Sequence, residues 1–459
     1  MNLNKHLIIA ILAFLMLNTM AVAQLRVSEN KRFLQTADGK PFFWLGDTAW
    51  ELFHRLDRDE ATKYLKNRSE KGFTVIQAVV LAELNGLHDP NPYGEVPLEN
   101  DDPTKPREAY FQHVDFIVRK AAELGLHIGM LPTWGDKVFK DRWGTGPEIF
   151  NVENAKVYGR WIGNRYKNDK NIIWIIGGDR NPKNDQHIEI WRAMAAGIEE
   201  AVGRENALMT FHPQPNGITD GGSAKWFHKD AWLDFNMFQT GHCRETNLWD
   251  RMKYAYDLQP TKPVLDGEPI YEDHPVCFNP TDLGISSAYD VRKSAWLDVF
   301  AGAFGHTYGC HDIWQMYAPH RTPVNGPQRP WYVAIDLPGA SQLKFLRKLI
   351  ESRPMFDRIP DQTLITDALG AGDHVQATRG NDYILVYSAQ GKKFVVNTNK
   401  ISGKEINANW YNPRNGEVTS IGKSARKNQQ EFVPPTSGYG HDWVLILDDA
   451  AKNYPLPQK

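Results

Sequence analysis

Short apolar runs alternate with amphipathic helical patterns from residue 41 to residue 350, and this alternation limits the possible folds more than any other feature of the sequence. Alternating strand and helix patterns are typical of a parallel sheet covered by helices. About eight repeats predict that the sheet closes into a (β/α)8 TIM barrel. An open, doubly wound sheet is the alternative, but no glycine-rich nucleotide-binding pattern follows the first strand to support it. The predicted strands are PFFWLGD (41–47), FTVIQAVV (73–80), HIGMLPTW (127–134), NIIWIIGGD (171–179), LMTFHP (208–213), FNMFQTGH (235–242), PVLDGEP (263–269) and GHTYGCHDIW (305–314).

The helical patterns fall between these strands. In the segment 107–125, apolar side chains such as Val114 and Ile117 recur on one helical face, and Gly125 suits a C-terminal cap. The segments 153–168 and 186–203 have the same periodicity. A further helical pattern, 343–354, ends at a proline, which cannot continue a helix.

The alternation of strand and helix patterns ends near residue 356. From about 360 to 449, short β-rich runs are separated by turn residues and little helical periodicity remains, which predicts a small all-β sandwich. A chain of 459 residues is also too long to fold around one ordinary hydrophobic core. We therefore predict a signal peptide over 1–23, a catalytic barrel over 24–355 and a C-terminal β-sandwich domain over 356–459.

The first residues have the features of a secretory signal peptide. Lys5 precedes an apolar run over 7–17, and Ala21-Val22-Ala23 provides small residues at a cleavage site before Gln24. The apolar run is too short for a stable transmembrane helix. The sequence predicts secretion across the inner membrane, to the periplasm or the outer surface, without membrane insertion after cleavage. A net charge of -2 gives no indication of a nucleic-acid partner.

The chain has three cysteines, Cys243, Cys277 and Cys310, which is an odd number for an oxidising compartment. One disulfide with one free thiol is compatible with this number, but the sequence does not indicate the pair. The spacing matches no zinc-binding motif.

Two acidic residues lie where a barrel carries its active site, at the carboxyl ends of the strands. Asp179 ends the fourth predicted strand and shares a face with Ile173 and Ile175, and Glu268 lies at the end of the seventh strand. A retaining glycosidase needs two such carboxylates, about 5–5.5 Å apart, across the barrel mouth. A helix cap or a structural salt bridge is the alternative role for each carboxylate taken alone.

Other strand ends have polar and aromatic side chains that are suited to binding sugar hydroxyls and sugar faces. Several histidines among them would also make a metal site conceivable, but no HxH or HExxH spacing occurs, so we predict no metal and no cofactor. Serine-hydrolase and phosphate-loop motifs are absent from the sequence. The predicted substrate-binding residues are Asp47, which could equally cap a turn, and Trp50, Gln77, Trp134, His212, Gln239, His242, Tyr308 and His311.

Four motifs in order resemble the apiosidase-like barrels of glycoside hydrolase family 140, namely FFWLGDTAW, GGDRN, DGEPIYE and AGAFGHTYGCHDIW. The tail, with NWYNPRNGE, resembles the collagen-binding-type β domain that follows such barrels. The resemblance covers nearly all of the mature chain. Many related barrels have Asn-Glu at the end of the fourth strand, whereas this chain has Gly-Asp.

The resemblance implies a secreted exo-acting glycosidase that releases D-apiose from the side chains of rhamnogalacturonan II, a pectin of the plant cell wall. It further implies that Asp179 is the acid/base and Glu268 the nucleophile of a retaining double displacement. Two alternatives remain open: a glycosidase of the same barrel type that acts on another plant glycan, and a non-catalytic protein that binds carbohydrate or collagen.

Overall fold

The structure is a computed structural model that describes residues 22–244, 247–366 and 371–457. Most of the predicted signal peptide, residues 1–21, therefore lies outside the described residues. A three-stranded antiparallel sheet precedes the barrel and consists of β1 (Leu25–Val27), β2 (Leu34–Thr36) and β3 (Pro41–Phe42).

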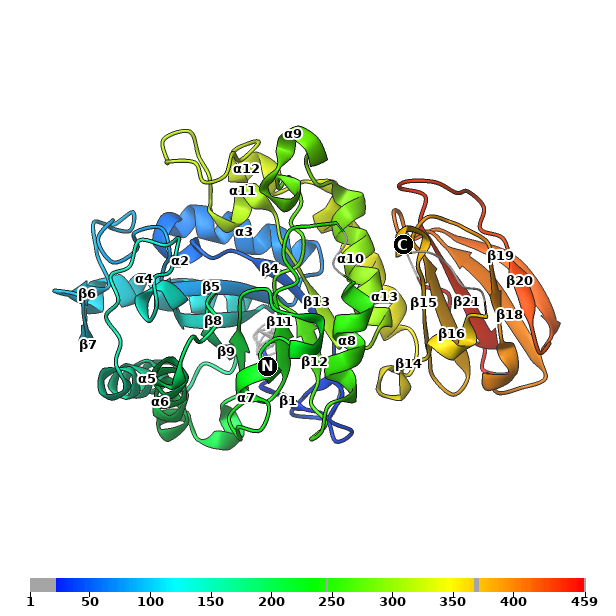
Figure 1. Ribbon diagram of the computed structural model, residues 1–459, viewed down its shortest axis with the longest axis horizontal. Helices are drawn as coiled ribbons and strands as arrows, with labels where there is room; N and C mark the ends of the chain where they lie inside the picture. Colours follow the sequence, from blue (N-terminus) through cyan, green and yellow to red (C-terminus); the bar gives the residue numbers. More distant parts are fainter. Residues whose placement is uncertain (1–21, 245–246, 367–370, 458–459) are drawn as a thin grey trace, which may run out of the picture.

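Eight parallel strands then form the curled sheet of an α/β barrel, and each overlaps one of the predicted runs (Figure 1). This confirms the predicted barrel fold. The strands are buried along their length, as expected for a parallel sheet covered by helices. They are β4 (Trp44–Thr48), β5 (Val75–Leu81), β8 (His127–Thr133), β9 (Ile172–Gly177), β10 (Met209–His212), β11 (Asn236–Phe238), β12 (Val264–Asp266) and β13 (Gly305–Tyr308).

The hydrogen-bond ladder of the barrel has two interruptions. Six strands pair in the order β10-β9-β8-β5-β4-β13, and β11 pairs with β12. At one interruption Thr210 Oγ1 donates to the carbonyl of Phe235 at 2.7 Å. At the other, the amide of Phe304 donates to the carbonyl of Val264 at 3.0 Å. A few hydrogen bonds at each interruption therefore connect the two sheets into one barrel.

Helices follow the strands and cover the outside of the barrel. The predicted helices are present, and α5 and α6 are capped by Asn151 and Asn184, whose side chains accept the amide hydrogens of Asn154 and His187. A short hairpin, β6 (Leu98–Glu99) and β7 (Asp102–Pro106), precedes α4. The helices are α2 (Leu52–Arg55), α3 (Arg58–Glu70), α4 (Glu108–Glu123), α5 (Val152–Tyr166), α6 (Asp185–Val202), α7 (Ala224–Phe227), α8 (Leu248–Asp257), α9 (Pro280–Leu283), α10 (Ala288–Phe300), α11 (His311–Trp314), α12 (Trp331–Ala334) and α13 (Pro338–Glu351).

The C-terminal part is an antiparallel β domain, as predicted, with its own core. Phe394, Trp410 and Leu445 are among the buried residues of this core. The larger sheet has the order β14-β15-β16-β21-β18-β19 and the smaller one pairs β17 with β20. These strands are β14 (Ile359–Pro360), β15 (Val375–Arg379), β16 (Tyr383–Ser388), β17 (Phe394–Val396), β18 (Glu405–Tyr411), β19 (Val418–Ala425), β20 (Gln430–Phe432) and β21 (Trp443–Asp449).

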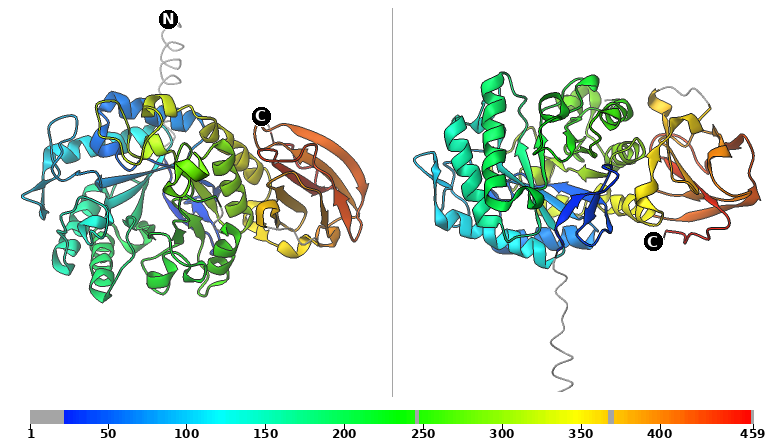
Figure 2. Two further views of the ribbon diagram at one scale, coloured as in Figure 1. Left: turned by 45° about the horizontal axis from the view of Figure 1, so that its top comes forward. Right: turned by 90° about the horizontal axis from the view of Figure 1, so that it is seen from below.

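The β domain packs against the side of the barrel formed by α10 and α13 (Figures 1 and 2). Arg292 of α10 donates two hydrogen bonds to the carboxylate of Asp442, at 2.7 and 2.8 Å, and both side chains are buried. Arg353, just after α13, makes the same paired contact with Asp448, at 2.7 and 2.9 Å. Planar guanidinium–carboxylate pairs of this kind fix orientation as well as contact. The two domains are therefore held in one arrangement.

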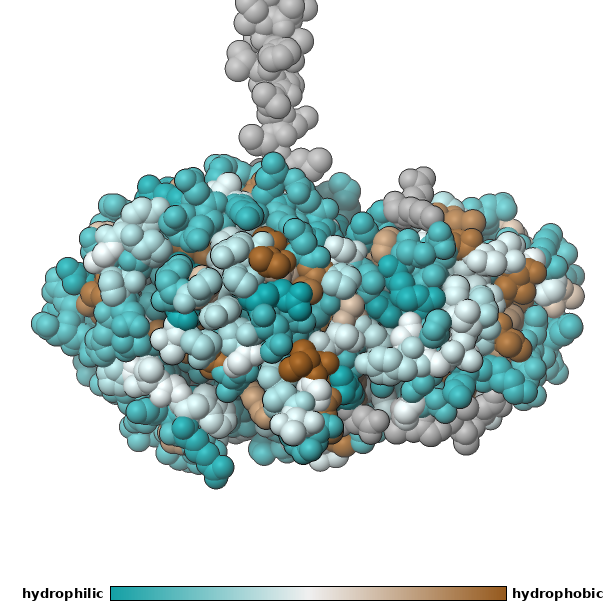
Figure 3. Space-filling model, turned by 90° about the horizontal axis from the view of Figure 1, so that it is seen from above, coloured by the Kyte–Doolittle hydropathy of each residue, from teal (hydrophilic) through white to brown (hydrophobic). Residues whose placement is uncertain are grey.

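The surface seen from above is mainly hydrophilic over both domains, with apolar residues scattered in small groups (Figure 3). Scattered apolar residues of this kind are normal on a protein surface. No helix within the described ranges combines the length and the apolar character needed to cross a membrane.

Candidate active site

The two glycines before Asp179 allow a sharp turn at the end of β9. Gly177 and Gly178 have φ of 93° and 130°, in the region that favours glycine, and Asp179 follows with φ of 48°. A Cβ atom at Gly178 would lie 2.8 Å from the ring of Trp134, and one at Gly177 would lie 2.7 Å from the carbonyl oxygen of His212. The turn therefore needs both glycines, and it presents Asp179 at the barrel mouth.

The carboxylate of Asp179 lies in a largely buried position, with 14% of its side chain exposed. Its Oδ2 accepts a hydrogen bond from the indole nitrogen of Trp143 at 2.7 Å and lies 3.3 Å from a nitrogen of Arg180. Burial and the negative charge of Glu268 raise the pKa of Asp179 to about 6, against the lowering effects of Arg180 and Trp143. Asp179 can therefore hold a proton in mildly acidic solution.

Trp143 reaches Asp179 from the loop between β8 and α5. The guanidinium of Arg180 holds this loop by donating to the carbonyls of Phe139 and Lys140, each at 3.0 Å, and to that of Trp143. The guanidinium also lies 4.8 Å from the centre of the Trp143 ring. With 44% of its surface exposed, the Trp143 ring offers an apolar face beside the carboxylate. Our sequence analysis did not identify Trp143, since only its position among glycines in a loop distinguishes it.

Glu268 lies between two histidines. Its Oε2 is 3.2 Å from Nε2 of His212, and its Oε1 is 3.3 Å from Nε2 of His242. Burial raises the pKa of Glu268, but the two histidines outweigh burial and bring the pKa to about 2. Glu268 is therefore ionised over the range in which Asp179 titrates.

His212 connects the two carboxylates. Its Nδ1 accepts the backbone amide hydrogen of Asp179 at 3.2 Å, so a neutral imidazole carries its proton on Nε2, which faces Glu268. Trp50 lies edge-on to the His212 ring at 5.4 Å and contacts Trp134 at 5.1 Å, both centroid distances. The structure thus brings Trp50, Trp134, His212 and His242 together around the predicted pair.

The two predicted glutamines and an additional tyrosine complete this region. Gln77 donates to the carbonyl of Gly267 at 2.8 Å, next to Glu268, and the Oε1 atoms of Gln77 and Gln239 have no hydrogen-bond partner among the described residues. Tyr271 was not predicted. Burial and the charge of Glu268 raise the pKa of Tyr271 well above its usual value, so its hydroxyl keeps its proton beside that carboxylate.

Three predicted substrate-binding residues have hydrogen-bond partners within the protein. Asp47 is fully buried, and its carboxylate accepts hydrogen bonds from Tyr64 and Arg68 of α3, so it ties this helix to the barrel. The Tyr308 hydroxyl donates to Glu272 at 2.7 Å. His311 uses Nε2 with the carbonyl of Asn325 and Nδ1 with the indole of Trp314, at 3.1 and 3.2 Å. Its two nitrogens therefore have protein partners already.

The role of Asp47 can be tested by stability measurements. Asp47→Ala should lower the free energy of unfolding by about 3 kcal/mol, because it leaves the buried Arg68 guanidinium without its carboxylate. Urea unfolding followed by circular dichroism measures this change. Asp38→Ala, which removes an exposed carboxylate paired with Lys40, is the matched control and should change stability little. An Asp47→Ala protein of unchanged stability but raised KM would instead support substrate binding.

The structure also identifies the disulfide that the sequence left open. Cys243 is bonded to Cys277, and Cys310 is a buried free thiol. The amide of Cys277 donates to the carbonyl of His242 at 2.9 Å, so this crosslink lies beside one of the two histidines at Glu268. Within the described part of the chain, no cluster of His, Cys, Asp and Glu side chains is arranged to hold a metal ion.

The arrangement provides one ionised carboxylate and one carboxyl group that can hold a proton. Environments that separate the pKa values of two neighbouring carboxyl groups are characteristic of acid and nucleophile pairs. Trp50 and Trp134 pack behind this pair, and the exposed ring of Trp143 beside Asp179 suits a sugar face. These features are those that hydrolysis of a glycosidic bond requires.

Comparisons with known proteins agree with this chemistry. Residues 28–357 match the family described as "Apiosidase-like, catalytic domain", and residues 359–448 match the family described as "Putative collagen-binding domain of a collagenase". No match is found among curated proteins.

Solved structures give the same result. One, named "Glycoside hydrolase", is 39% identical with a TM-score of 0.86, and the match covers 95% of this chain and 99% of that one. Another, a glycoside hydrolase family 5 protein from Bacteroides vulgatus, is 37% identical with a TM-score of 0.86, and the match covers 95% of both chains. A third, also from Bacteroides vulgatus, is 17% identical with a TM-score of 0.66 and supports the fold alone. With a family match over most of its length and relatives above 35% identity, the chain belongs to the apiosidase-like glycoside hydrolases.

Proposed function

We propose that this glycoside hydrolase is an exo-acting enzyme that releases D-apiose from the side chains of rhamnogalacturonan II with retention of configuration. The observation that carries the chemistry is the pair Asp179 and Glu268, whose pKa values of about 6 and about 2 suit an acid/base and a nucleophile. The substrate rests on the apiosidase-like match over residues 28–357.

The proposed reaction has two displacements. Glu268 attacks the anomeric carbon and forms a glycosyl ester, while the bond to the leaving oxygen breaks and that oxygen takes the proton of Asp179. Water then attacks the same carbon and gives a proton to Asp179, and the ester bond to Glu268 breaks. His212 and His242 stabilise the Glu268 carboxylate at the start and the end of this cycle.

The substrate is tested by supplying purified enzyme with rhamnogalacturonan II oligosaccharides and a panel of pectins, arabinans and β-glucans. Apiose release supports the full proposal. Cleavage of another glycan alone would contradict the apiose assignment and leave the glycosidase chemistry intact. The configuration of the first product, followed by proton NMR, decides between retention and inversion. A protein that cleaves nothing and binds collagen would contradict the proposal as a whole.

We also propose that the protein acts outside the cytoplasm, in the periplasm or at the outer surface. The predicted signal peptide over 1–23 and the Cys243–Cys277 disulfide both support an oxidising compartment. Fusion of residues 1–23 to a reporter that folds only after export tests this proposal, and a cytoplasmic reporter would contradict it.

Activity should depend on pH through the protonation of Asp179. Because the acid must hold its proton, kcat/KM should fall as pH rises through about 6. Trp143→Phe removes the indole hydrogen bond that stabilises the ionised carboxylate, so it should raise the pKa of Asp179. The high-pH decline should then move upward by about one pH unit, equivalent to about 1.4 kcal/mol. Profiles of kcat/KM between pH 3 and 9 measure this shift.

Trp161→Phe is the control for this experiment, since Trp161 lies on α5 and packs on Phe111, at a ring distance of 4.5 Å. Its profile should match that of the wild type. A Trp143→Phe profile that moves to lower pH would show that the indole does not stabilise the Asp179 carboxylate.

A further inference from the structure

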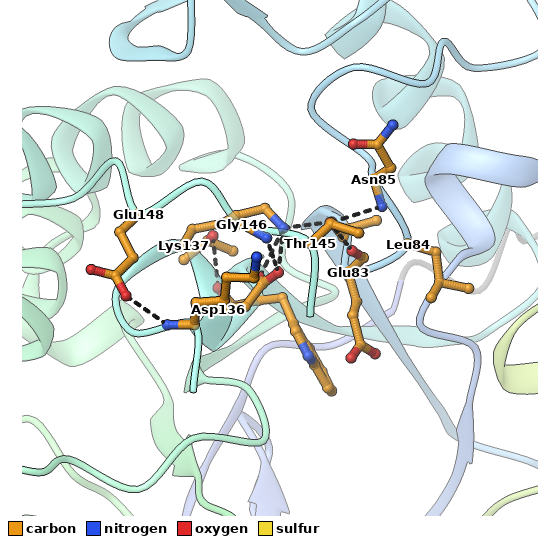
Figure 4. Close-up of polar contacts among 12 residues, drawn as sticks. Glu83, Leu84, Asn85, Asp136, Lys137, Thr145, Gly146 and Glu148 are labelled. Atoms are coloured by element: carbon orange, nitrogen blue, oxygen red, sulfur yellow. Dashed lines mark hydrogen bonds and ion pairs between the residues drawn. The ribbon is translucent and has the colours of Figure 1, made fainter. Parts of the chain in front are cut away.

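A third carboxyl group, that of Glu83, lies two residues after β5, where the backbone contacts the loop that also brings Trp143 to Asp179. Its backbone is fixed on both sides. Thr145 Oγ1 donates to the carbonyl of Glu83 at 2.8 Å, and the amide of Leu84 donates to Glu51 Oε1 at 3.1 Å. Figure 4 shows the Glu83 side chain directed away from Thr145, with no dashed line to its carboxylate. The fold therefore holds the backbone of Glu83 in place and leaves its side-chain oxygens without a hydrogen bond or ion pair to any described residue.

The acidic neighbours of Glu83 do have partners. Asp136 accepts from Lys137 Nζ at 2.8 Å and from the amide of Gly146 at 2.9 Å. Glu51 contacts His54 at 2.5 Å in addition to the amide of Leu84. Asp179 accepts a hydrogen bond from Trp143 and forms an ion pair with Arg180. Among these four carboxyl groups, only that of Glu83 has no partner within the described residues.

A partly buried carboxyl group without a partner costs stability, so its presence needs an explanation. Burial, with the negative charges of Asp179 and Asp136, raises the pKa of Glu83 well above its usual value. A neutral carboxyl group can donate one hydrogen bond and accept others, which matches a sugar hydroxyl. It also adds no negative charge beside Asp179 when that residue has given up its proton.

We propose that Glu83 is a substrate-binding residue of this site and that its carboxyl group binds a hydroxyl group of the sugar beside Asp179. The proposal rests on the proposed glycosidase site but not on apiose as its substrate. The free carboxyl group at the end of β5 thus contributes to recognition of the glycan. It takes no part in bond breaking, which remains with Asp179 and Glu268.

The test compares Glu83→Ala and Glu83→Gln with the wild type on whichever glycan of the panel the wild type cleaves best. Glu83→Ala should raise KM at least about 10-fold with kcat within about 3-fold, since it removes the hydroxyl's partner. Glu83→Gln, which keeps a donor and an acceptor, should stay within about 3-fold of the wild-type KM. Glu99→Ala is the matched control, because Glu99 is an exposed carboxylate on β6, and it should change neither constant.

A second measurement does not depend on turnover. Thermal unfolding of Glu83→Ala should show a Tm equal to or above that of the wild type, because the variant loses an unpartnered, partly buried carboxyl group. A structural role predicts a lower Tm instead. Calorimetric titration of the same glycan into Glu268→Gln and into the Glu268→Gln/Glu83→Ala double variant should show at least about 10-fold weaker binding in the latter.

Unchanged KM and unchanged affinity in the Glu83→Ala proteins would overturn this proposal, even if the enzyme releases apiose. A lowered Tm with an unchanged KM would overturn it as well. Conversely, if the wild type cleaves a glycan other than rhamnogalacturonan II and Glu83→Ala raises KM on that glycan, the Glu83 assignment stands and the apiose assignment fails.

Discussion

Glu268→Gln is expected to lower kcat/KM by at least about 10⁴-fold on every glycan that the wild type cleaves. The amide has nearly the same shape as the carboxylate, but it cannot form the glycosyl ester that the first displacement requires. The substitution also leaves His212 and His242 without the carboxylate that they contact at 3.2 and 3.3 Å. Initial rates at several substrate concentrations, with circular dichroism to confirm folding, measure the loss.

The smaller variant Glu268→Gly gives a sharper version of this experiment. With an activated aryl glycoside and sodium azide, azide can enter the space of the missing side chain and attack the anomeric carbon from the same side. The product should be a glycosyl azide of configuration opposite to that of the substrate. Glu99→Gln is the control and should keep wild-type activity. If Glu268→Gln kept a tenth of the wild-type rate, Glu268 could not be the nucleophile.

Asp179→Asn is expected to lower the rate on natural glycans by about 10²–10⁴-fold, because the leaving oxygen no longer receives a proton. On a dinitrophenyl glycoside, whose leaving group needs no proton, the first step should survive and the second should become slow. The glycosyl-enzyme ester on Glu268 should then accumulate, and intact-protein mass spectrometry would detect the added sugar mass.

Asp185→Asn is the matched control, since Asp185 is an exposed aspartate at the start of α6, six residues away in sequence. It should behave like the wild type on both substrates. Equal losses of the Asp179→Asn protein on the natural glycan and on the dinitrophenyl glycoside would show that Asp179 does not act as the acid.

The sequence was informative where local pattern determines structure. Alternating strand and helix patterns predicted the barrel, and the apolar run before Gly177 placed Asp179 at a strand end. The position of a residue at a strand end did not reveal its role, however. Asp47 also lies at such an end, but Arg68 reaches it from α3, thirteen residues long, and makes it part of the interior. Only the packing of that helix distinguishes the two aspartates.

Contacts that depend on loops could not be predicted in the same way. Trp143 reaches Asp179 because Arg180, three residues after β9, holds the carbonyls of Phe139 and Lys140 in the loop before α5. Glu83 follows the second predicted strand, and its place in the sequence gives no sign that its side chain lacks a partner. The lack of a partner is a property of the folded chain, in which Lys137 pairs with Asp136 and His54 pairs with Glu51. The Cys243–Cys277 pair likewise depends on how two loops meet.

The two guanidinium–carboxylate pairs between the domains have a consequence for how this protein can be divided. A fragment that ends at residue 357 would keep every residue of the candidate site, but Arg292 and Arg353 would lose Asp442 and Asp448. The Trp296 ring, stacked on Tyr387 at 5.8 Å, would also lose that partner. The domain boundary near residue 357 is therefore a poor position at which to truncate the protein. In protein engineering, the barrel and its β domain should be kept together as one unit.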